Sequence, residues 1–157
     1  MLSLLIHAVL GAVTFWIFLV VNAHLYRRDW KGSDVTFLEG VYYVLAVVSV
    51  LAGWYYNVSY VFGYPAEYSW QHFTGMLFTN PASGSVGQDM IITNCFLLPL
   101  WTMIDGPRRG LRGTWIYFVM SLFTSFSFAM GLYLAAQERQ VRWQRWQASR
   151  GEAAARV

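Results

Sequence analysis

The chain has 157 residues, of which 57% are hydrophobic, 18% are aromatic and only 12% are charged. Soluble domains usually carry about 25% charged residues, so the composition excludes an ordinary water-soluble domain and predicts an all-α, polytopic membrane protein. The formal net charge is only +3, and the basic residues form no patch interleaved with aromatics, which argues against nucleic-acid binding. The single cysteine, Cys95, cannot form an intramolecular disulfide.

The first predicted element is a transmembrane helix over residues 4–22. Met1–Ser3 carries no basic side chain, and the apolar run continues to Val21. A cleaved signal peptide has a basic start and a shorter apolar core, so we expect this helix to be retained. About 20 residues of helix cross the roughly 30 Å hydrocarbon core, which is close to the length of this run.

The second predicted span covers residues 38–62 and carries a stripe of small or polar side chains at helical spacing. Small residues let two helix backbones approach closely, and close packing drives helix association inside a membrane. The stripe therefore predicts a packing face, used either within the chain's own bundle or against a partner subunit. Its members are Ala46, Ser49, Gly53 and Asn57.

Between the second and third spans, residues 63–85 contain no Lys or Arg and predict a short helix on the membrane surface. Pro65 and Glu67 are typical of a first helical turn. Apolar side chains then recur on one face, and an Asn-Pro pair ends the helix. The residues assigned to this interfacial segment are Trp70, Phe73, Leu77 and Asn80.

The third predicted span, 86–104, contains Asp89 near its start. A charge at the bilayer centre costs about 2.5–3.5 kcal/mol, so an intramembrane carboxyl is a candidate functional group. The alternative is a structural role, because the dipole of a helix stabilises an anion in its first turn. Glu67 is predicted on the same side of the membrane as Asp89. The two carboxyls would then face each other across a pocket mouth, where one of them serves as a general acid.

The fourth predicted span covers residues 114–136, and a polar, arginine-rich tail follows over residues 137–157. Ser127, Gly131 and Ala135 form a second small-residue stripe in this span. Basic residues favour the cytoplasmic side, and six of them lie in the first and third loops against five in the tail. This count predicts that both termini lie outside. The loop residues are Arg27, Arg28, Lys31, Arg108, Arg109 and Arg112, and the tail residues are Arg139, Arg142, Arg145, Arg150 and Arg156.

The second half of the chain, over about residues 77–139, resembles a family of small bacterial membrane proteins of unknown function, DUF2834. The matching motifs are Leu77-Phe78-Thr79-Asn80-Pro81-Ala82-Ser83, Asp89-Met90-Ile91-Ile92, Gly106-Pro107-Arg108-Arg109-Gly110-Leu111-Arg112 with Trp115, Leu132-Tyr133-Leu134, and Gln137-Glu138-Arg139. The resemblance implies a multi-pass protein of the bacterial cytoplasmic membrane and carries over no catalytic residue. Members look like three-helix proteins, so the first span here is extra. Members also tend to have a proline where this chain has Gly131.

No cofactor or metal is implied, because the sequence has no phosphate-binding loop and no cysteine cluster. His7 and His24 are about 25 Å apart along a helix and cannot ligate one haem iron, whereas His7 and His72 could meet on the outer side. We expect the partners to be membrane lipids and other membrane-protein subunits.

The leading hypothesis for function is a small, non-catalytic accessory subunit of a larger membrane complex that handles lipids or electrons. A small transporter is less favoured, because no inverted repeat is visible. The main alternative is a membrane enzyme acting on a lipid-like substrate, similar in type to a membrane terpene cyclase. Such an enzyme needs an acid, for which Asp89 and Glu67 are candidates, and aromatic faces that stabilise cations. The aromatic candidates are Trp54, Tyr55, Tyr56 and Trp70.

Overall fold

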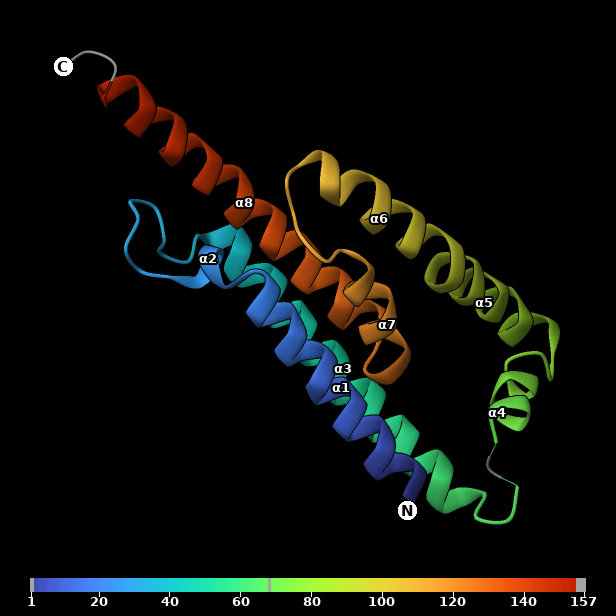
Figure 1. The fold of residues 1–157 in the computed structure, drawn as a ribbon. Helices are drawn as coiled ribbons and strands as arrows, with labels where there is room; N and C mark the ends of the chain where they lie inside the picture. The colour runs from blue at the N-terminus through green and yellow to red at the C-terminus, as the bar shows by residue number, and fades with distance from the viewer. Residues whose placement is uncertain (1, 68, 155–157) are drawn as a thin grey trace.

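The computed structural model describes residues 2–67 and 69–154, and within these ranges the chain is helical with no strand (Figure 1). The all-α prediction is therefore confirmed. The elements are α1 (Leu2–Val21), α2 (Ala23–Tyr26), α3 (Phe37–Gly63), α4 (Trp70–Met76), α5 (Pro81–Ile92), η1 (Thr93–Leu97), α6 (Leu98–Arg108), α7 (Trp115–Phe123) and α8 (Phe126–Ala154).

The first two predicted spans correspond to α1 and α3, with ends within two residues of the predicted ones. Thr36 begins α3 as its N-cap, because the Thr36 hydroxyl accepts a hydrogen bond from the amide of Glu39. Among the described residues, α1 and α3 are the helices that are individually long and apolar enough to cross a membrane.

The predicted interfacial helix is shorter than expected. Residues 65–67 form a turn, and α4 begins only at Trp70, where the Ser69 hydroxyl accepts a hydrogen bond from the amide of His72. Leu77 follows the end of α4, and Asn80 does not end that helix but caps the next one. Asn80 and Ser83 form a reciprocal capping box with Pro81 in the first turn of α5, which is a strong start signal.

The third predicted span is part of a longer helical run, in which α5, η1 and α6 follow one another without a gap. The π-helical segment η1 ends at Leu97, two residues before Pro99. Proline has no N–H to donate to the carbonyl of Cys95, and its ring would collide with that carbonyl in a regular α-helix. The wider π turn accommodates the missing donor and the bulk of the ring, so the helical run continues through Pro99 without a gap.

The fourth predicted span, 114–136, is wrong as a single helix. The chain leaves the helical region at Thr124 (φ −121°, ψ −93°), so α7 ends and α8 begins as a separate helix. Ser125 caps the start of α8, since its hydroxyl accepts a hydrogen bond from the amide of Phe128 at 3.1 Å. The two helices fold back on each other as a hairpin (Figure 1).

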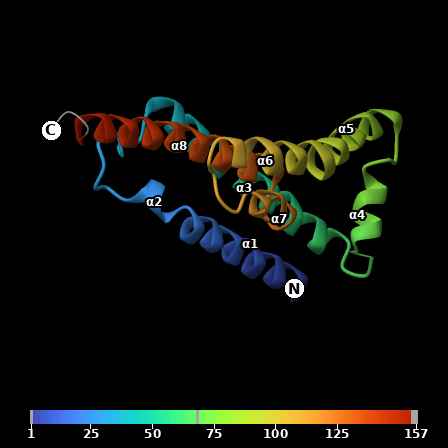
Figure 2. The ribbon, with the colours of Figure 1, turned by 45° about the horizontal axis from the view of Figure 1, so that its top comes forward.

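Contacts between this hairpin and α1 show how far the hairpin extends along that helix. A Cβ on Gly113, just before α7, would lie 2.9 Å from Val21 at the end of α1, whereas one on Gly11 would lie 3.1 Å from Thr124. The turn of the hairpin therefore reaches only the middle of α1. From there α8 returns beside α3 and extends beyond the other helices, so the N-terminal and C-terminal ends lie at opposite ends of the molecule (Figures 1 and 2).

The buried core lies between α1, α7 and α8, where aromatic rings interlock. Phe18 packs against Tyr117 with ring centroids 5.6 Å apart, and Tyr117 meets Tyr133 edge-to-face at 5.1 Å. Small residues fill the remaining space next to α3 and allow the backbones to approach. The core consists of Phe18, Leu25, Leu111, Ile116, Tyr117, Met120, Ala129, Leu132, Tyr133 and Ala136.

The outer surface is strongly apolar along the three long helical runs. Soluble proteins rarely expose contiguous apolar patches of more than a few hundred Å², so this surface is typical of contact with lipid or protein. Exposed large apolar residues include Leu5, Val9, Val13 and Trp16 on α1, Val44, Val47, Val48 and Leu51 on α3, and Met90, Phe96, Leu97, Leu100, Trp101 and Met103 on the run from α5 to α6.

Candidate functional site

A buried ionic cluster lies at the end of the molecule that contains α2 and the start of α3. The Glu39 side chain is fully buried and accepts hydrogen bonds from Arg139 and Arg142 of α8 and from the hydroxyl of Tyr43 at 2.8 Å. Arg139 also donates to the carbonyl of Leu25 at 2.8 Å. A buried charge requires such partners, because desolvation of an unpaired one costs several kcal/mol.

The same arginines fasten the loop between α2 and α3. Arg142 donates to the carbonyls of Gly32 and Asp34 at 2.6 and 2.7 Å. The guanidinium of Arg139 lies 5.1 Å from the ring centre of Tyr26, and that of Arg142 lies 5.9 Å from Trp30. The cluster therefore joins α3, α8 and the first loop.

A second polar cluster surrounds Asp105 at the same end, just beyond the predicted span 86–104. The Asp105 carboxylate accepts hydrogen bonds from Arg109 at 2.8 Å, Tyr133 at 3.1 Å and Gln137 at 2.5 Å. Burial acts to raise the pKa of Asp105, but these three donors outweigh it and hold the pKa below its ordinary value. Gln144 further bonds the carbonyl of Arg109 at 2.9 Å, so the loop after α6 is tied to α8.

Sequence reasoning missed both clusters because their members are far apart in the chain. Glu39 and Asp105 lie next to the ends of predicted spans, whereas Arg139 and Arg142 were assigned to the polar, arginine-rich tail. A weak signal was present, because Arg139 and Arg142 are three residues apart and so share one face of a helix. Nothing in the sequence indicates which loop that face contacts.

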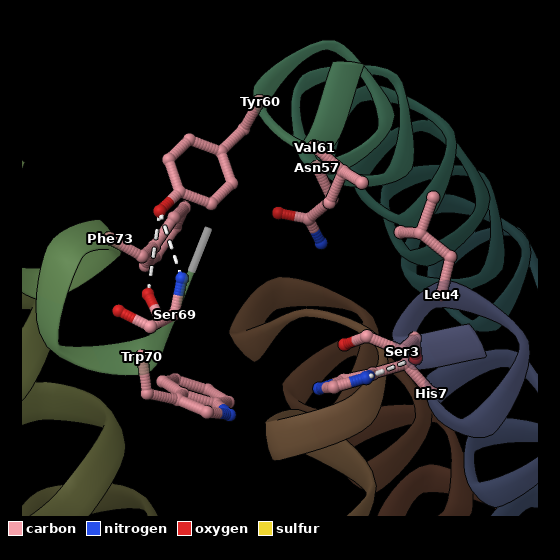
Figure 3. Close-up of a pocket in the computed structure, with 9 residues that line it drawn as sticks. All are labelled: Ser3, Leu4, His7, Asn57, Tyr60, Val61, Ser69, Trp70 and Phe73. Carbon is pink, nitrogen blue, oxygen red and sulfur yellow. Dashed lines mark hydrogen bonds between the residues drawn. The ribbon is translucent and has the colours of Figure 1, made fainter. Parts of the chain in front are cut away.

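The opposite end of the molecule contains a pocket of about 170 Å³ between α1, α3 and α4 (Figure 3). Its lining combines aromatic, aliphatic and polar side chains. The residues are Ser3, Leu4, His7, Asn57, Tyr60, Val61, Ser69, Trp70 and Phe73. Two interfacial candidates, Trp70 and Phe73, and one stripe residue, Asn57, thus meet at one site.

Glu67 lies beside this pocket, next to His72 and Tyr60. The Glu67 carboxylate is 3.4 Å from Nε2 of His72, and Nδ1 of His72 is 2.8 Å from the hydroxyl of Tyr60. The Tyr60 hydroxyl also lies 3.4 Å from both the backbone nitrogen and the carbonyl oxygen of Ser69, which begins α4. Together these contacts attach α4 to the end of α3.

Asp89 does not face Glu67 across the pocket. It lies on the exposed surface of α5, eight residues after Pro81, so it is neither in the first turn nor a helix cap. Within the described residues, its hydrogen-bond partner is the adjacent Gln88 at 2.5 Å. The proposed pair of acids is therefore not formed in this structure.

The two small-residue stripes largely meet each other inside the chain. A Cβ on Gly131 would lie 3.0 Å from the Cβ of Ala46, and Ala46 and Ala135 are fully buried. The hydroxyls of Ser49 and Ser125 are 2.8 Å apart, and Gly53 faces the Thr124–Ser125 turn. Of the residues assigned to the stripes, Ser127 is exposed.

The aromatic residues considered for cation stabilisation do not line one cavity. Tyr55 and Tyr56 are 68% and 69% exposed and contact each other on the outer surface of α3. Trp54 lines a separate shallow groove with Phe15 and Phe128, and Trp70 lines the pocket of Figure 3. The structure thus lacks a shared aromatic enclosure for these four residues.

The comparisons with known proteins identify a family for this fold. The model of the family described as "Protein of unknown function DUF2834" matches residues 41–139, from α3 into α8. No curated protein and no solved structure shows significant similarity to the chain. The matched region contains Glu39's partner Arg139, Asp89, and most of the pocket wall, and it excludes α1. Because the match covers more than half of the chain, the protein belongs to the DUF2834 family.

Proposed function

We propose that this protein is a small, non-catalytic accessory subunit of a larger complex in a bacterial cytoplasmic membrane. Membrane embedding is supported by the apolar side chains exposed on α1, α3 and the run from α5 to α6. The long axis also fits a bilayer, since the 20 residues of α1 span about 30 Å, close to the thickness of the hydrocarbon core.

The distribution of basic residues supports a revised topology. Arg139 and Arg142 contact the first loop, and Gln144 contacts the third loop, so the tail and both basic loops lie at one end of the molecule. The conflict between loops and tail in the sequence count disappears, because all these basic residues favour the same side. That side is cytoplasmic in the proposed topology, with the N-terminus outside and the C-terminal end inside.

The number of crossings changes accordingly. In this topology α1, α3 and the run from α5 to α6, as far as residue 104, cross the membrane, whereas α7 and α8 form a hairpin that enters and leaves on the cytoplasmic side. Non-helical backbone is tolerated at this depth where it packs against protein, and the half-buried residues Phe123–Ser125 lie against Gly11 of α1 and Gly53 of α3. The Thr124 amide and hydroxyl both donate to the carbonyl of Met120, at 3.0 and 2.7 Å, and the Ser125 hydroxyl bonds that of Ser49, so several polar groups of the turn have partners within the chain.

The observation that carries the accessory role is the surface of α5 around Asp89. Of the residues in α5, only Gly87 is buried, so this helix presents nearly all of its side chains outside the chain. Asp89 lies about 24 Å along the helix from Asp105, near the outer boundary of the hydrocarbon core. A carboxylate whose hydrogen-bond partner among the described residues is an adjacent amide is unfavourable in acyl chains, and a donor on a neighbouring membrane subunit would stabilise it.

Affinity co-purification in a mild detergent tests this proposal. Asp89→Asn should reduce the recovery of a co-purifying membrane subunit more than tenfold, or about 1.4 kcal/mol, while leaving the monomer's thermal unfolding unchanged. Asp29→Asn is the matched control, because Asp29 is an exposed loop carboxylate paired with Arg27 at 3.5 Å. Equal recovery for both variants, or a chain that purifies alone from native membranes, would contradict the accessory role.

A further inference from the structure

The pocket between α1, α3 and α4 has features of a ligand site that the accessory role does not use (Figure 3). Its volume of about 170 Å³ is slightly larger than an apolar cavity of about 150 Å³ that accepts benzene. One six-membered ring with small substituents therefore fits. The pocket lies near the N-terminal end of α1 and the C-terminal end of α3, which is the outer boundary in the proposed topology.

His7 presents a defined hydrogen-bonding atom to this pocket. Its Nδ1 lies 2.7 Å from the backbone carbonyl of Ser3, and a carbonyl can only accept, so Nδ1 carries the proton. In the neutral ring Nε2 is then an acceptor. Figure 3 shows this second nitrogen directed into the cavity, away from Ser3. The ring is held in place by Trp70 and Phe123, whose centroids are 6.2 and 5.8 Å away.

Asn57 supplies a second polar group on the facing wall. Its amide is directed into the cavity in Figure 3 and makes no hydrogen bond to any residue that the structure describes. An amide offers both a donor and an acceptor, so it can bond a hydroxyl or a carbonyl oxygen. The remaining walls are apolar, from Leu4 and Val61, and aromatic, from Trp70 and Phe73.

The aromatic wall is positioned by two neighbouring residues, Tyr60 and His72. Tyr60 holds α4 through its hydrogen bond with His72, and Tyr60 also packs edge-to-face on Phe73 at 5.2 Å. Trp70 in turn packs against both Phe73 and His7, with ring centroids 6.3 and 6.2 Å apart, so the aromatic walls and His7 are held in fixed relative positions. A preset pocket with few polar groups and mostly apolar walls is the usual form of a small-molecule site.

We propose that this pocket binds the hydroxylated aromatic ring of a membrane hydroquinone, with a ring hydroxyl donating to Nε2 of His7 and a second ring oxygen bonding the amide of Asn57. A hydroquinone matches the site because it has a flat ring for the aromatic walls and a donor for the acceptor nitrogen. Leu4 and Val61 provide apolar contact for the alkyl tail. The inference does not depend on the accessory role, because all its residues belong to this chain.

The test is equilibrium binding of a decyl-substituted dimethoxy-methyl hydroquinone to the full chain in nanodiscs. His7→Phe keeps a ring against Trp70 and Phe123 but removes the acceptor, and Asn57→Leu keeps the volume but removes the amide. Each should weaken binding about 3- to 10-fold, the usual effect of one neutral hydrogen bond. Trp16→Phe, on the outer surface of α1, and Ser59→Ala, on the exposed side of α3, are the matched controls and should bind as the parent does.

Two further probes identify what the pocket recognises. The same hydroquinone without its tail should bind more weakly but with the same dependence on His7 and Asn57. Decanol, which has the tail and a hydroxyl but no ring, should bind without that dependence. The proposal is overturned if the hydroquinone does not bind to the unmodified protein in nanodiscs although its thermal unfolding shows that it is folded. It is also overturned if His7→Phe and Asn57→Leu bind it as the controls do, since partitioning into lipid would then explain the signal.

Discussion

Gly131 of α8 lies directly against Ala46 of α3, so close that a Cβ at Gly131 would be 3.0 Å from the Ala46 Cβ and 2.9 Å from the carbonyl oxygen of Tyr42. Contacts at this distance leave no room for a side chain unless one helix moves. Both residues were expected in packing stripes, and the tertiary structure shows that each is the other's partner. A second protein has no access to Gly131, because it is buried within the chain.

Substitution of Gly131 is therefore predicted to destabilise the chain itself. Gly131→Ala should lower the free energy of unfolding by about 1–3 kcal/mol, as overpacking does, and Gly131→Leu by more. Gly151→Ala in the same helix is the control, because no atom lies within 4 Å of the position that a Cβ would take there, and alanine should stabilise the helix by roughly 0.5–1 kcal/mol. Thermal unfolding in detergent measures both. Parental stability of Gly131→Leu would refute the close contact.

The buried cluster around Glu39 gives a second prediction. Arg139→Met removes one partner of a buried carboxylate and should cost about 3–5 kcal/mol, whereas Arg145→Met on the exposed part of α8 should change stability by less than about 0.5 kcal/mol. Glu39→Leu should be severe because it leaves two arginines unpaired. Adding Arg139→Met to Glu39→Leu should recover part of the loss in the same unfolding assay. Additive losses would mean that the two side chains do not interact.

The lowered pKa of Asp105 predicts that the free energy of unfolding decreases at acidic pH. Its folded-state pKa is lowered by Arg109, Tyr133 and Gln137 relative to an ordinary value of 3.8. The ionised form is therefore favoured by folding, and this contribution is fully present above about pH 4. It is lost as the pH falls through the lower, folded-state pKa. Comparing unfolding curves of the parent and Asp105→Asn between neutral and acidic pH isolates it, and the difference between the two should shrink on acidification.

The revised topology is tested by labelling single cysteines from outside intact cells, in a background with Cys95→Ser. Gln71→Cys in α4 should react with a membrane-impermeant maleimide, while Lys31→Cys and Ser149→Cys should react only after permeabilisation. Ser149 is the decisive position, because the sequence count predicts the tail outside and the packing of α8 against both basic loops predicts it inside. External labelling of Ser149→Cys would restore a continuous fourth span.

The sequence determined the features that depend on local composition. Apolar runs of about 20 residues identified α1 and α3 almost to the residue, because a helix that meets lipid must be apolar over that length. The two packing stripes were also recognisable from the sequence, because Gly131 and Ala46 each belong to a set of small residues at helical spacing. The start of α5 carried its own capping signal in Asn80, Pro81 and Ser83, although the Asn80-Pro81 pair was assigned to the end of the preceding helix.

The tertiary structure alone decided where the chain turns and which ends meet. The break at Thr124 and Ser125 is hidden in an apolar run whose length fits a span, and the long-range bond of Ser125 to Ser49 that holds the turn against α3 is visible only in the folded chain. The tail's arginines similarly acquire a role only when α8 folds back beside Glu39. Hydropathy records whether a segment prefers lipid, but not whether it crosses or returns, because both paths bury the same apolar side chains and differ only in long-range contacts.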